Sequence, residues 1–250
     1  MLQQLFLCAN TIILGQKNKL LCYNKIPMKK LPYLGGFLFL LLAIFSYLVS
    51  KSIFDQLDFN TTVKIQDKLP DFLIGPFSIF SLLGSIEIAS IVLLLILILS
   101  KKLKSIFVLF FYGLVGFFEL YGKSVIEQKG PPILFLKTHL PFQFPSSYIP
   151  HEFFAYPSGH SARTAFVSLV LLFVIWKSPK LNKELKLIFA FLILTFDFLM
   201  FVSRIYLGEH WTTDVIGGIL LGSSLALLSA FFLIPSALKR VGAGGKRKNC

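Results

Sequence analysis

The sequence predicts an all-α fold, a polytopic membrane helical bundle of about six transmembrane helices with both termini cytoplasmic. The composition is the first observation behind this prediction: of 250 residues, 55% are hydrophobic and 15% are charged, and the mean hydropathy is +0.75. Soluble domains of this length are usually much less apolar. The other two observations are apolar runs of bilayer-spanning length and lysines that gather between alternate runs. A lipid bilayer is therefore the expected surrounding of most of the chain.

The apolar runs are each roughly 16–23 residues long, which suits a helix that crosses a bilayer. They lie near 31–49, 81–100, 105–122, 161–176, 185–203 and 212–234. Membrane strands are not expected, because the runs lack the alternation of a barrel and backbone groups in lipid must bond within their own segment. The stretch 72–80 is too short to span and is expected at the interface. Gly218 and Gly222 form a GxxxG pattern, which predicts close helix packing.

Basic residues predict the orientation, because cytoplasmic loops near span ends retain lysine and arginine. They gather in four segments, within 17–30, 101–104, 177–186 and 239–248. The expected organisation is a basic N-terminal segment (1–30), one six-span domain (31–235) with an outer loop at 123–160, and a basic cytoplasmic tail (236–250). Met28 precedes two lysines and an apolar run, so translation is expected to be able to begin there.

The formal net charge of +13 does not indicate nucleic-acid binding. Nucleic-acid modules carry basic stripes interleaved with aromatics on a soluble surface, whereas these lysines lie between apolar runs. Cys8, Cys22 and Cys250 lie near the chain ends without a CxxC pair, so they predict neither a zinc site nor a disulfide framework. We therefore expect no cofactor and no metal, and the expected partner is the bilayer itself.

Several polar residues fall at the predicted ends of spans that face the same side. With the orientation above, they are Lys123 at the end of the third span, Pro157–His160 at the start of the fourth, Ser203 and Arg204 at the end of the fifth, and His210 and Asp214 at the start of the sixth. Ionisable groups at membrane depth are expensive to keep and indicate function. We expect these residues to form one site at the outer face.

The residue types suit phosphoryl transfer, which needs cations and N–H donors around the phosphate, an in-line nucleophile and an acid for the leaving group. Ser158 and Gly159 stand where a helix N-terminus presents N–H groups to an anion. His210 and Asp214 are one helical turn apart, so the carboxylate can bond one ring nitrogen and leave the other to attack phosphorus. His160 can then protonate the leaving oxygen.

These motifs resemble the type 2 phosphatidic acid phosphatases, a superfamily that also includes vanadium-dependent haloperoxidases. Its signature is K-x6-R-P, then P-S-G-H, then S-R-x5-H-x3-D. Pro157–His160 matches the second part and Ser203–Asp214 the third, and the resemblance covers roughly 85–235. It implies a metal-independent phosphatase with a phosphohistidine on His210, oriented by Asp214, and acid–base chemistry by His160. It also implies phosphate binding by Lys123, Ser158, Gly159 and Arg204.

The first part of the signature is incomplete, because Gly130 stands where the family carries arginine. Two cations are candidates to replace it. Lys129 is adjacent in the chain, and Arg163 lies three residues after His160 on the same helix face. We favour Arg163 slightly, because a rigid helix places a side chain better than a loop does, and a lysine supplies a point charge where arginine supplies a planar fork.

Other polar residues are expected to have structural roles. Glu119 precedes Lys123 by one turn and is expected to pair with it. Asp197 is expected to form a buried hydrogen bond that supports span packing. His139, His151 and Glu152 lie in the outer loop without the spacing of metal ligands.

The resemblance implies an integral phosphatase of the plasma membrane with its site on the extracytoplasmic face, acting on a lipid phosphate or pyrophosphate. Phosphatidic acid, undecaprenyl pyrophosphate and phosphatidylglycerol phosphate are all candidates. One alternative is a lipid phosphotransferase, since a phosphohistidine can pass its group to an alcohol. Another is a non-catalytic binder or transporter of lipid phosphate, for which paired half-repeats would be evidence. Product analysis distinguishes hydrolysis from transfer.

Overall fold

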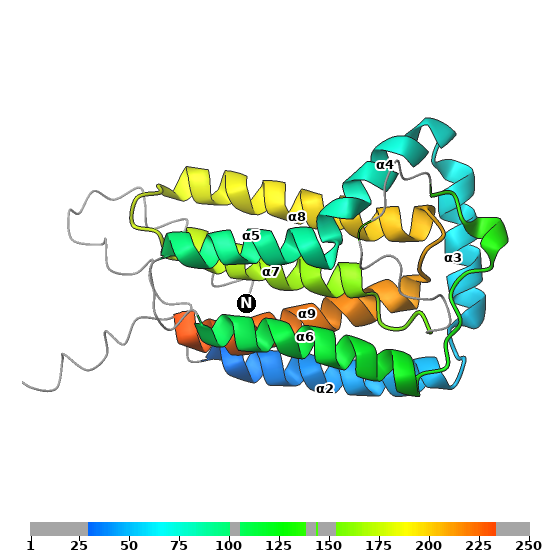
Figure 1. Cartoon of the computed structure of the whole chain (residues 1–250), viewed down its shortest axis with the longest axis horizontal. Coiled ribbons are helices and arrows are strands. Elements are labelled where there is room, and N and C mark those ends of the chain that lie inside the picture. Colours follow the sequence, from blue (N-terminus) through cyan, green and yellow to red (C-terminus); the bar gives the residue numbers. More distant parts are fainter. Residues whose placement is uncertain (1–29, 101–105, 139–143, 145–153, 234–250) are drawn as a thin grey trace, which may run out of the picture.

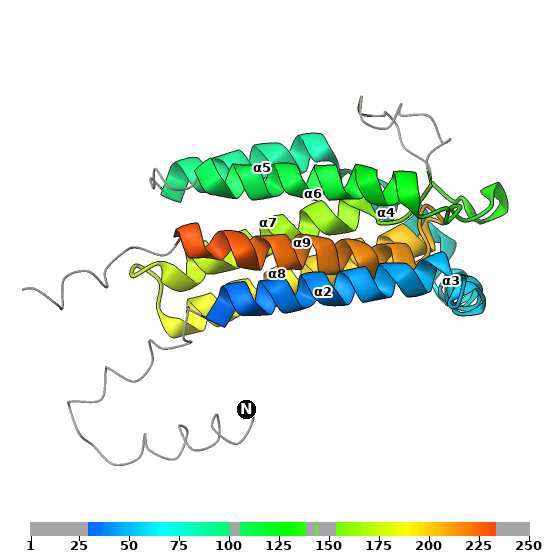
Figure 2. The same ribbon diagram turned by 90° about the horizontal axis from the view of Figure 1, so that it is seen from below.

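The computed structural model describes residues 30–100, 106–138, 144 and 154–233, and all regular structure in these residues is helical. Six long helices run along the long axis of the molecule (Figures 1 and 2). They are α2 (Leu31–Ser50), α5 (Ile86–Ser100), α6 (Ile106–Val125), α7 (Gly159–Lys177), α8 (Lys183–Tyr206) and α9 (Thr212–Leu233). The predicted all-α bundle is confirmed for this part of the chain.

Five of these helices are long and apolar enough to cross a membrane by themselves. The sixth span, predicted as an unbroken run at 81–100, is instead bent: the segments Asp71–Gly84 and Ile86–Ser100 meet at 54°. The short stretch at 72–80 is helical and contains α4 (Ile74–Ser81), so it leads directly into this span. Ser85 breaks the helix with extended backbone, and its Oγ accepts a hydrogen bond from the Ile88 N–H at 3.3 Å, which starts α5.

A set of short helices covers one end of the bundle. The longest is α3 (Asp55–Lys68), which lies across the ends of the long helices (Figure 1). The others are the 3₁₀ turns η2 (Asp71–Leu73), η3 (Leu82–Gly84) and η5 (Ile133–Phe135). We call this end, where α6 and α8 finish and α7 and α9 begin, the motif end.

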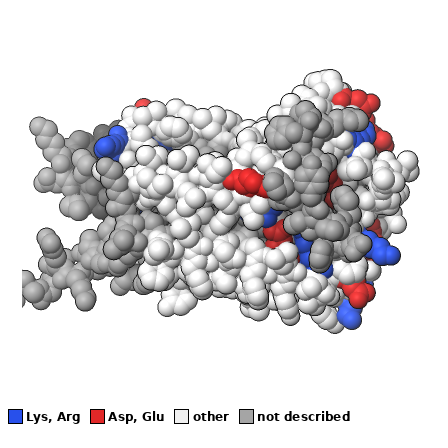
Figure 3. Space-filling view, in the orientation of Figure 1, with Lys and Arg blue, Asp and Glu red and all other residues white. Residues whose placement is uncertain are grey.

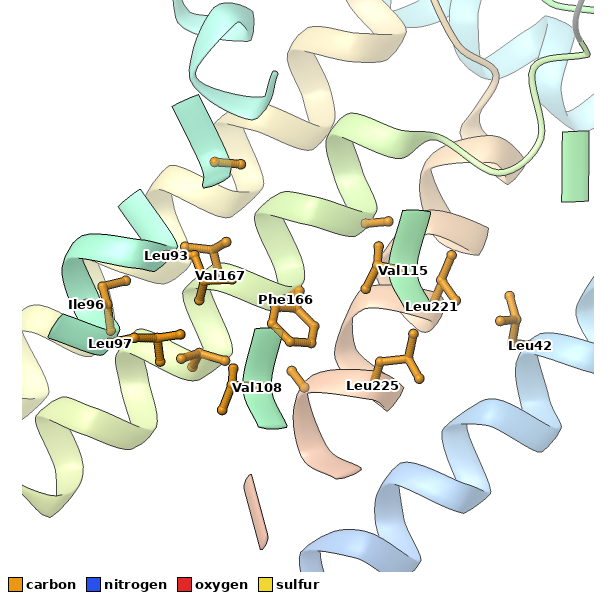
Figure 4. Packing of buried hydrophobic residues seen from close by; sticks show 14 residues of the cluster. Leu42, Leu93, Ile96, Leu97, Val108, Val115, Phe166, Val167, Leu221 and Leu225 are labelled. Carbon is orange, nitrogen blue, oxygen red and sulfur yellow. The ribbon is translucent and has the colours of Figure 1, made fainter. Parts of the chain in front are cut away.

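Helices α7 and α9 form the centre of the bundle. Within their most apolar stretches, 56% of α7 and 72% of α9 is buried, against 6% of α8. Aliphatic side chains from α5, α6 and α9 surround Phe166 of α7 (Figure 4). Because α7 and α9 are buried by their neighbours while α8 keeps most of its surface for lipid, the two motif-bearing helix starts belong to the most deeply buried spans.

The GxxxG pattern in α9 has the predicted effect. A Cβ at Gly218 would overlap the carbonyl oxygen of Ser158, and a Cβ at Gly222 would overlap that of Ala162. The backbones of α7 and α9 therefore touch, which only glycine permits at these positions. Close packing by this pattern is confirmed, and it fixes the start of α7 against the start of α9.

On the face shown in Figure 3, most of the coloured charged side chains lie toward the motif end, and the surface of the long helices is largely uncharged. This distribution, together with the spans, describes a multi-pass membrane protein. The predictions made for Met28, His139, His151, Glu152, the N-terminal basic segment and the basic tail lie outside the described residues. The domain boundaries and the cytoplasmic position of the termini stay predictions.

Candidate active site

The predicted convergence of four chain segments is present at the motif end. Lys123 lies in the last turn of α6, Ser158 caps α7, Arg204 lies in the last turn of α8, and His210 lies directly before α9. The backbone N–H of Ser158 donates to the carbonyl of Asp214 at 2.9 Å. This bond ties the P-S-G-H segment to the segment that carries His210.

His210 and Asp214 form the expected pair. Nδ1 of His210 lies 3.4 Å from Oδ2 of Asp214, and the same oxygen accepts a hydrogen bond from the Trp211 backbone N–H at 2.9 Å. The carboxylate is completely buried, and the ring of His210 keeps 12% of its surface exposed. Because Nδ1 faces the carboxylate, Nε2 is the ring nitrogen left for a substrate.

The surroundings keep the His210 imidazole neutral. Burial lowers the pKa of His210 well below its usual range, and the positive charges of Arg204, Lys123 and Arg163 lower this pKa further. A neutral imidazole carries the lone pair that a nucleophile needs. A neutral His210 is therefore chemically able to act as a nucleophile.

The start of α7 supplies backbone donors. Oγ of Ser158 caps the helix by accepting from the Ser161 N–H at 3.5 Å, and it also accepts from the Ser161 hydroxyl at 3.1 Å. The N–H groups of Gly159 and His160 lie in the first turn, where no helix carbonyl can accept from them. These two N–H groups are better placed than the Ser158 hydroxyl to bind an anion.

An inner ion-pair cluster lies beneath this helix start and consists of Lys123, Glu119 and Arg163. Nζ of Lys123 lies 2.9 Å from one oxygen of Glu119, and Nη1 of Arg163 lies 2.5 Å from the other. The predicted Glu119–Lys123 pair is confirmed, and the bridge to Arg163 was not predicted. A Cβ at Gly159 would overlap the Glu119 carboxylate, so glycine is required there.

The bend before α5 completes the floor of the site. Nε of Arg163 donates to the carbonyl of Gly84 at 3.4 Å, so the bend supports this guanidinium. A Cβ at Gly84 would lie only 3.1 Å from the ring of His160. Hydropathy could place a span here but could not reveal the bend, and so this contact with His160 was missed.

Arg204 is held from the turn that follows α8. Its Nη2 pairs with Oε2 of Glu209, and Oε1 of Glu209 accepts a hydrogen bond from the Thr138 hydroxyl at 2.7 Å. Nε of Arg204 is buried and has no hydrogen-bond partner among the described residues. A buried donor of this kind is costly unless a ligand satisfies it. Glu209 occupies one of the unspecified positions of the motif, so sequence reasoning missed it.

The two candidates for the missing arginine lie in different places. Lys129 is exposed at the rim of a cavity of about 700 Å³ that Gly130 and Trp211 also line, and its carbonyl accepts from Nε1 of Trp211 at 2.8 Å. Arg163 is inside the site, where its charge acts on His210. A Cβ at Gly130 would meet only Ala155, at an ordinary 3.6 Å, so packing does not require glycine there.

Asp58 of α3 is a second residue that sequence reasoning missed. It is buried, and its carboxylate accepts hydrogen bonds from the Thr213 N–H at 2.9 Å, the Thr213 hydroxyl at 2.5 Å and the Gln128 amide at 3.2 Å. Burial raises the pKa of Asp58, and these hydrogen bonds partly offset the effect. Because its partner lies 155 residues away in the chain, no local pattern could have identified this link.

Tyr156 anchors the segment before α7. Its hydroxyl shares a hydrogen bond of 2.8 Å with Oγ of Ser46 in α2, and its ring lies against Gly217 of α9, where no Cβ would fit. Burial raises the pKa of Tyr156 to about 12, so the phenol stays protonated and keeps this bond. The P-S-G-H segment is thus fixed from two helices.

Two curated proteins resemble parts of the chain. A phosphatidylglycerophosphatase B of Bacillus subtilis is 39% identical over 82 residues, which cover 32% of this chain and 37% of that protein. An undecaprenyl-diphosphatase of Sulfolobus acidocaldarius is 32% identical over 120 residues, which cover 48% of this chain and 50% of that protein. The chain therefore spans between a third and a half of the length of these relatives.

Two crystal structures share the fold. The first is the transmembrane PAP2 type phosphatidylglycerolphosphate phosphatase of Bacillus subtilis, with a TM-score of 0.67 and 22% identity, covering 80% of this chain and 96% of that one. The second is LpxE of Aquifex aeolicus, with a TM-score of 0.51 and 23% identity, covering 70% and 95%. Residues 92–234, which include every motif residue described above, match the PAP2 superfamily. The chain belongs to the PAP2 superfamily.

Proposed function

We propose that this protein is a metal-independent membrane phosphatase that hydrolyses the terminal phosphate of a lipid phosphate or lipid pyrophosphate. The observation that carries the proposal is the His210–Asp214 pair, which faces the cations Lys123, Arg163 and Arg204 at a single end of the bundle. The names of the two curated relatives, a phosphatidylglycerophosphatase and an undecaprenyl-diphosphatase, support this substrate class.

The proposed reaction has two steps. In the first, Nε2 of His210 attacks phosphorus, the bond to the lipid oxygen breaks, and His160, acting as an imidazolium in the substrate complex, gives a proton to that oxygen as it leaves. In the second, His160 takes a proton from a water molecule that attacks the phosphohistidine, and the N–P bond breaks to release inorganic phosphate. Asp214 holds the His210 ring and stabilises the charge that the ring gains in the first step.

The phosphate oxygens would be held by the cations and by the start of α7. The first-turn N–H groups of Gly159 and His160 supply directed donors, as does Nε of Arg204, which has no partner within the described part of the chain. Lys123 supplies a point charge. We propose that Arg163 takes the place of the arginine absent at Gly130. Its bonds to Glu119 and to the Gly84 carbonyl fix the guanidinium, whereas Lys129 lies exposed at the cavity rim.

The proposed location is the extracytoplasmic face of the plasma membrane. The sequence distribution of lysine and arginine supports this sidedness, since the four basic segments would stay cytoplasmic. A site at the end of the spans can take a lipid headgroup while the hydrocarbon tail stays in the bilayer.

The test is release of inorganic phosphate from phosphatidic acid, phosphatidylglycerol phosphate and undecaprenyl pyrophosphate, in detergent with a chelator present. His210→Asn keeps a polar side chain but removes the nucleophile, and turnover should fall by at least about 10³-fold. Lys129→Ala at the cavity rim serves as the control and should stay within about threefold. Equal turnover by wild type and His210→Asn would exclude His210 as the nucleophile.

A further inference from the structure

Three cations and three carboxylates lie together at the site. Lys123, Arg163 and Arg204 face three carboxylates, those of Glu119, Glu209 and Asp214. A terminal phosphate brings up to two negative charges into this buried group. Burying an excess of negative charge costs free energy. Binding of the phosphate is therefore easiest if one carboxylate gives up its cation to the ligand.

Two of these carboxylates bind the cations directly, and they differ. Glu119 bridges two cations and its side chain is 9% exposed, below the start of α7. Glu209 pairs with one cation and its side chain is 20% exposed, in the turn between α8 and α9. Glu119 cannot leave without unpairing both Lys123 and Arg163. Glu209 is the carboxylate that a ligand can replace most easily.

The guanidinium of Arg204 shows where the replacement would occur. Nε–H and one Nη2–H of an arginine point along the same edge and together bind two oxygens of one anion. In Arg204, Glu209 occupies Nη2, while Nε is buried without a partner among the described residues. On this edge, Nη2 is therefore bound by an internal anion, while Nε has no partner in the described part of the chain. A phosphate that bound both donors would have to take Nη2 from Glu209.

The backbone around Glu209 is fixed, so the change can be confined to its side chain. The N–H of Lys137 donates to the Leu207 carbonyl at 3.0 Å, and the Gln66 amide donates to the carbonyls of Phe135 and Tyr206 at 2.8 and 2.9 Å. Gly208 has a φ of +69° and packs against the Phe135 carbonyl, a conformation that suits glycine. The turn can therefore stay in place while the carboxylate rotates away.

We propose that Glu209 is an internal competitor of the phosphate group, holding Arg204 in the empty site and giving it up when substrate binds. This inference rests on the proposed function, because it assigns Arg204 to phosphate binding. Thr138 is the residue that holds the competitor in place, through its hydrogen bond of 2.7 Å to Oε1. Glu209 thus sets how strongly an anion must bind before it occupies the site, and it limits retention of the phosphate product.

If Glu209 were instead a fixed support that positions Arg204, its removal would weaken phosphate binding. The test measures binding of inorganic phosphate to the full chain in detergent by titration calorimetry, at constant pH and ionic strength. For Glu209→Gln, whose neutral amide competes more weakly for the guanidinium, phosphate should bind roughly tenfold more tightly than to wild type. In turnover assays KM should fall as well, whereas loss of a support would raise KM and lower kcat.

Glu127→Gln is the matched control, because it removes the same charge from an exposed position at the motif end. Its phosphate affinity should stay within about twofold of wild type, which separates local competition from a general loss of negative charge. Thr138→Val removes the hydrogen bond that holds Glu209 and should tighten phosphate binding by about threefold. Thr138→Val decides the matter if Glu209→Gln does not fold.

Equal or weaker phosphate binding by both variants would overturn the proposal. Failure of the proposed function gives a different pattern: phosphate release is the same in wild type and His210→Asn, whatever the phosphate affinity of the Glu209 variant. If wild type hydrolyses lipid phosphate but neither Glu209→Gln nor Thr138→Val binds phosphate more tightly, the proposed function stands and Glu209 is not a competitor.

Discussion

The motif end and the membrane-embedded part of the bundle are held together by different forces. At the motif end, ion pairs and hydrogen bonds join segments that are far apart in the chain, as Asp58 joins α3 to Thr213 of α9. Along the spans, aliphatic and aromatic side chains pack around Phe166, and backbones touch at Gly218 and Gly222. The Ser168–Asp197 hydrogen bond of 2.6 Å between α7 and α8 is a polar contact within the spans, as predicted for Asp197.

The packed spans position the helix ends, and the polar motif end carries the reactive groups. Lipid offers no hydrophobic driving force between helices, so the spans depend on close packing. That packing fixes where α7 and α9 begin, and ionic and polar side chains at the motif end complete the site. Changes to the site cations should therefore alter catalysis more than stability, and changes at the packed glycines should alter stability first.

Among variants that keep His210, the largest effect is expected for Arg163→Ala, which removes a site cation and leaves Glu119 with one partner instead of two. We expect kcat/KM to fall by roughly 10²- to 10³-fold, the range for loss of one donor to a transition-state oxyanion. Arg163→Lys should recover only part of this loss, because an ammonium lacks the planar fork. Unchanged turnover and phosphate affinity in Arg163→Ala would show that this residue does not replace the arginine absent at Gly130.

Gly222→Leu should disrupt the α7–α9 contact. Because a Cβ at Gly222 overlaps the Ala162 carbonyl, overpacking should destabilise the protein by about 1–3 kcal/mol or more, measured by unfolding in detergent. Gly116→Leu is the matched control in α6, since nothing lies within 4 Å of its missing Cβ. Equal losses of unfolding free energy in Gly222→Leu and Gly116→Leu would show that the close backbone contact at Gly222 does not stabilise the spans.

Asp58→Ala tests the polar link at the motif end. It leaves the buried Thr213 N–H and hydroxyl without their acceptor, which should lower the unfolding free energy by about 1–3 kcal/mol. Asp55→Ala, an exposed change in the first turn of the same helix, should cost about 1 kcal/mol or less. Similar losses of unfolding free energy in the two variants would show that the buried carboxylate of Asp58 stabilises the protein no more than the exposed carboxylate of Asp55 does.

The pH dependence of kcat/KM should report the lowered pKa of His210. Burial and the nearby cations oppose protonation of His210, so the nucleophile is lost only when the pH falls below its depressed pKa. Lys123→Met removes one of these positive charges, so the pKa of His210 should rise and the acidic limb of the kcat/KM profile should move to higher pH. The ionisation of the substrate is the same in both proteins and does not contribute to this shift. A limb that moved to lower pH would contradict this assignment of charges.

The smallest effect is expected on the lipid-facing side of α8. Leu192→Ala lies on an exposed part of this helix, and we expect a change in unfolding free energy within about 0.5 kcal/mol and unchanged turnover. A large loss there would show that another part of the protein, or a second copy, packs on this face.

Much of this arrangement could be predicted from the sequence, for physical reasons that differ by region. Hydropathy identified the spans because each must satisfy its own backbone in lipid. The motifs at Pro157–His160 and Ser203–Asp214 predicted the candidate site, because phosphoryl transfer requires those residue types. The bend at Ser85 was not predicted, because hydropathy does not record the direction of the backbone. The Glu119–Arg163 bridge was not predicted, because it depends on how two distant segments meet. Glu209 was missed because only its pairing with Arg204 in the structure gives it a role.

The central claim is that His210 carries the phosphoryl group between substrate and water. The most direct test is rapid acid-free quenching of the protein during turnover of a lipid labelled with ³²P in its terminal phosphate, followed by peptide mapping. The account predicts an acid-labile, base-stable phosphohistidine at His210 in wild type and no label in His210→Asn. Labelled protein in His210→Asn, or a label that maps to another residue in wild type, would contradict it.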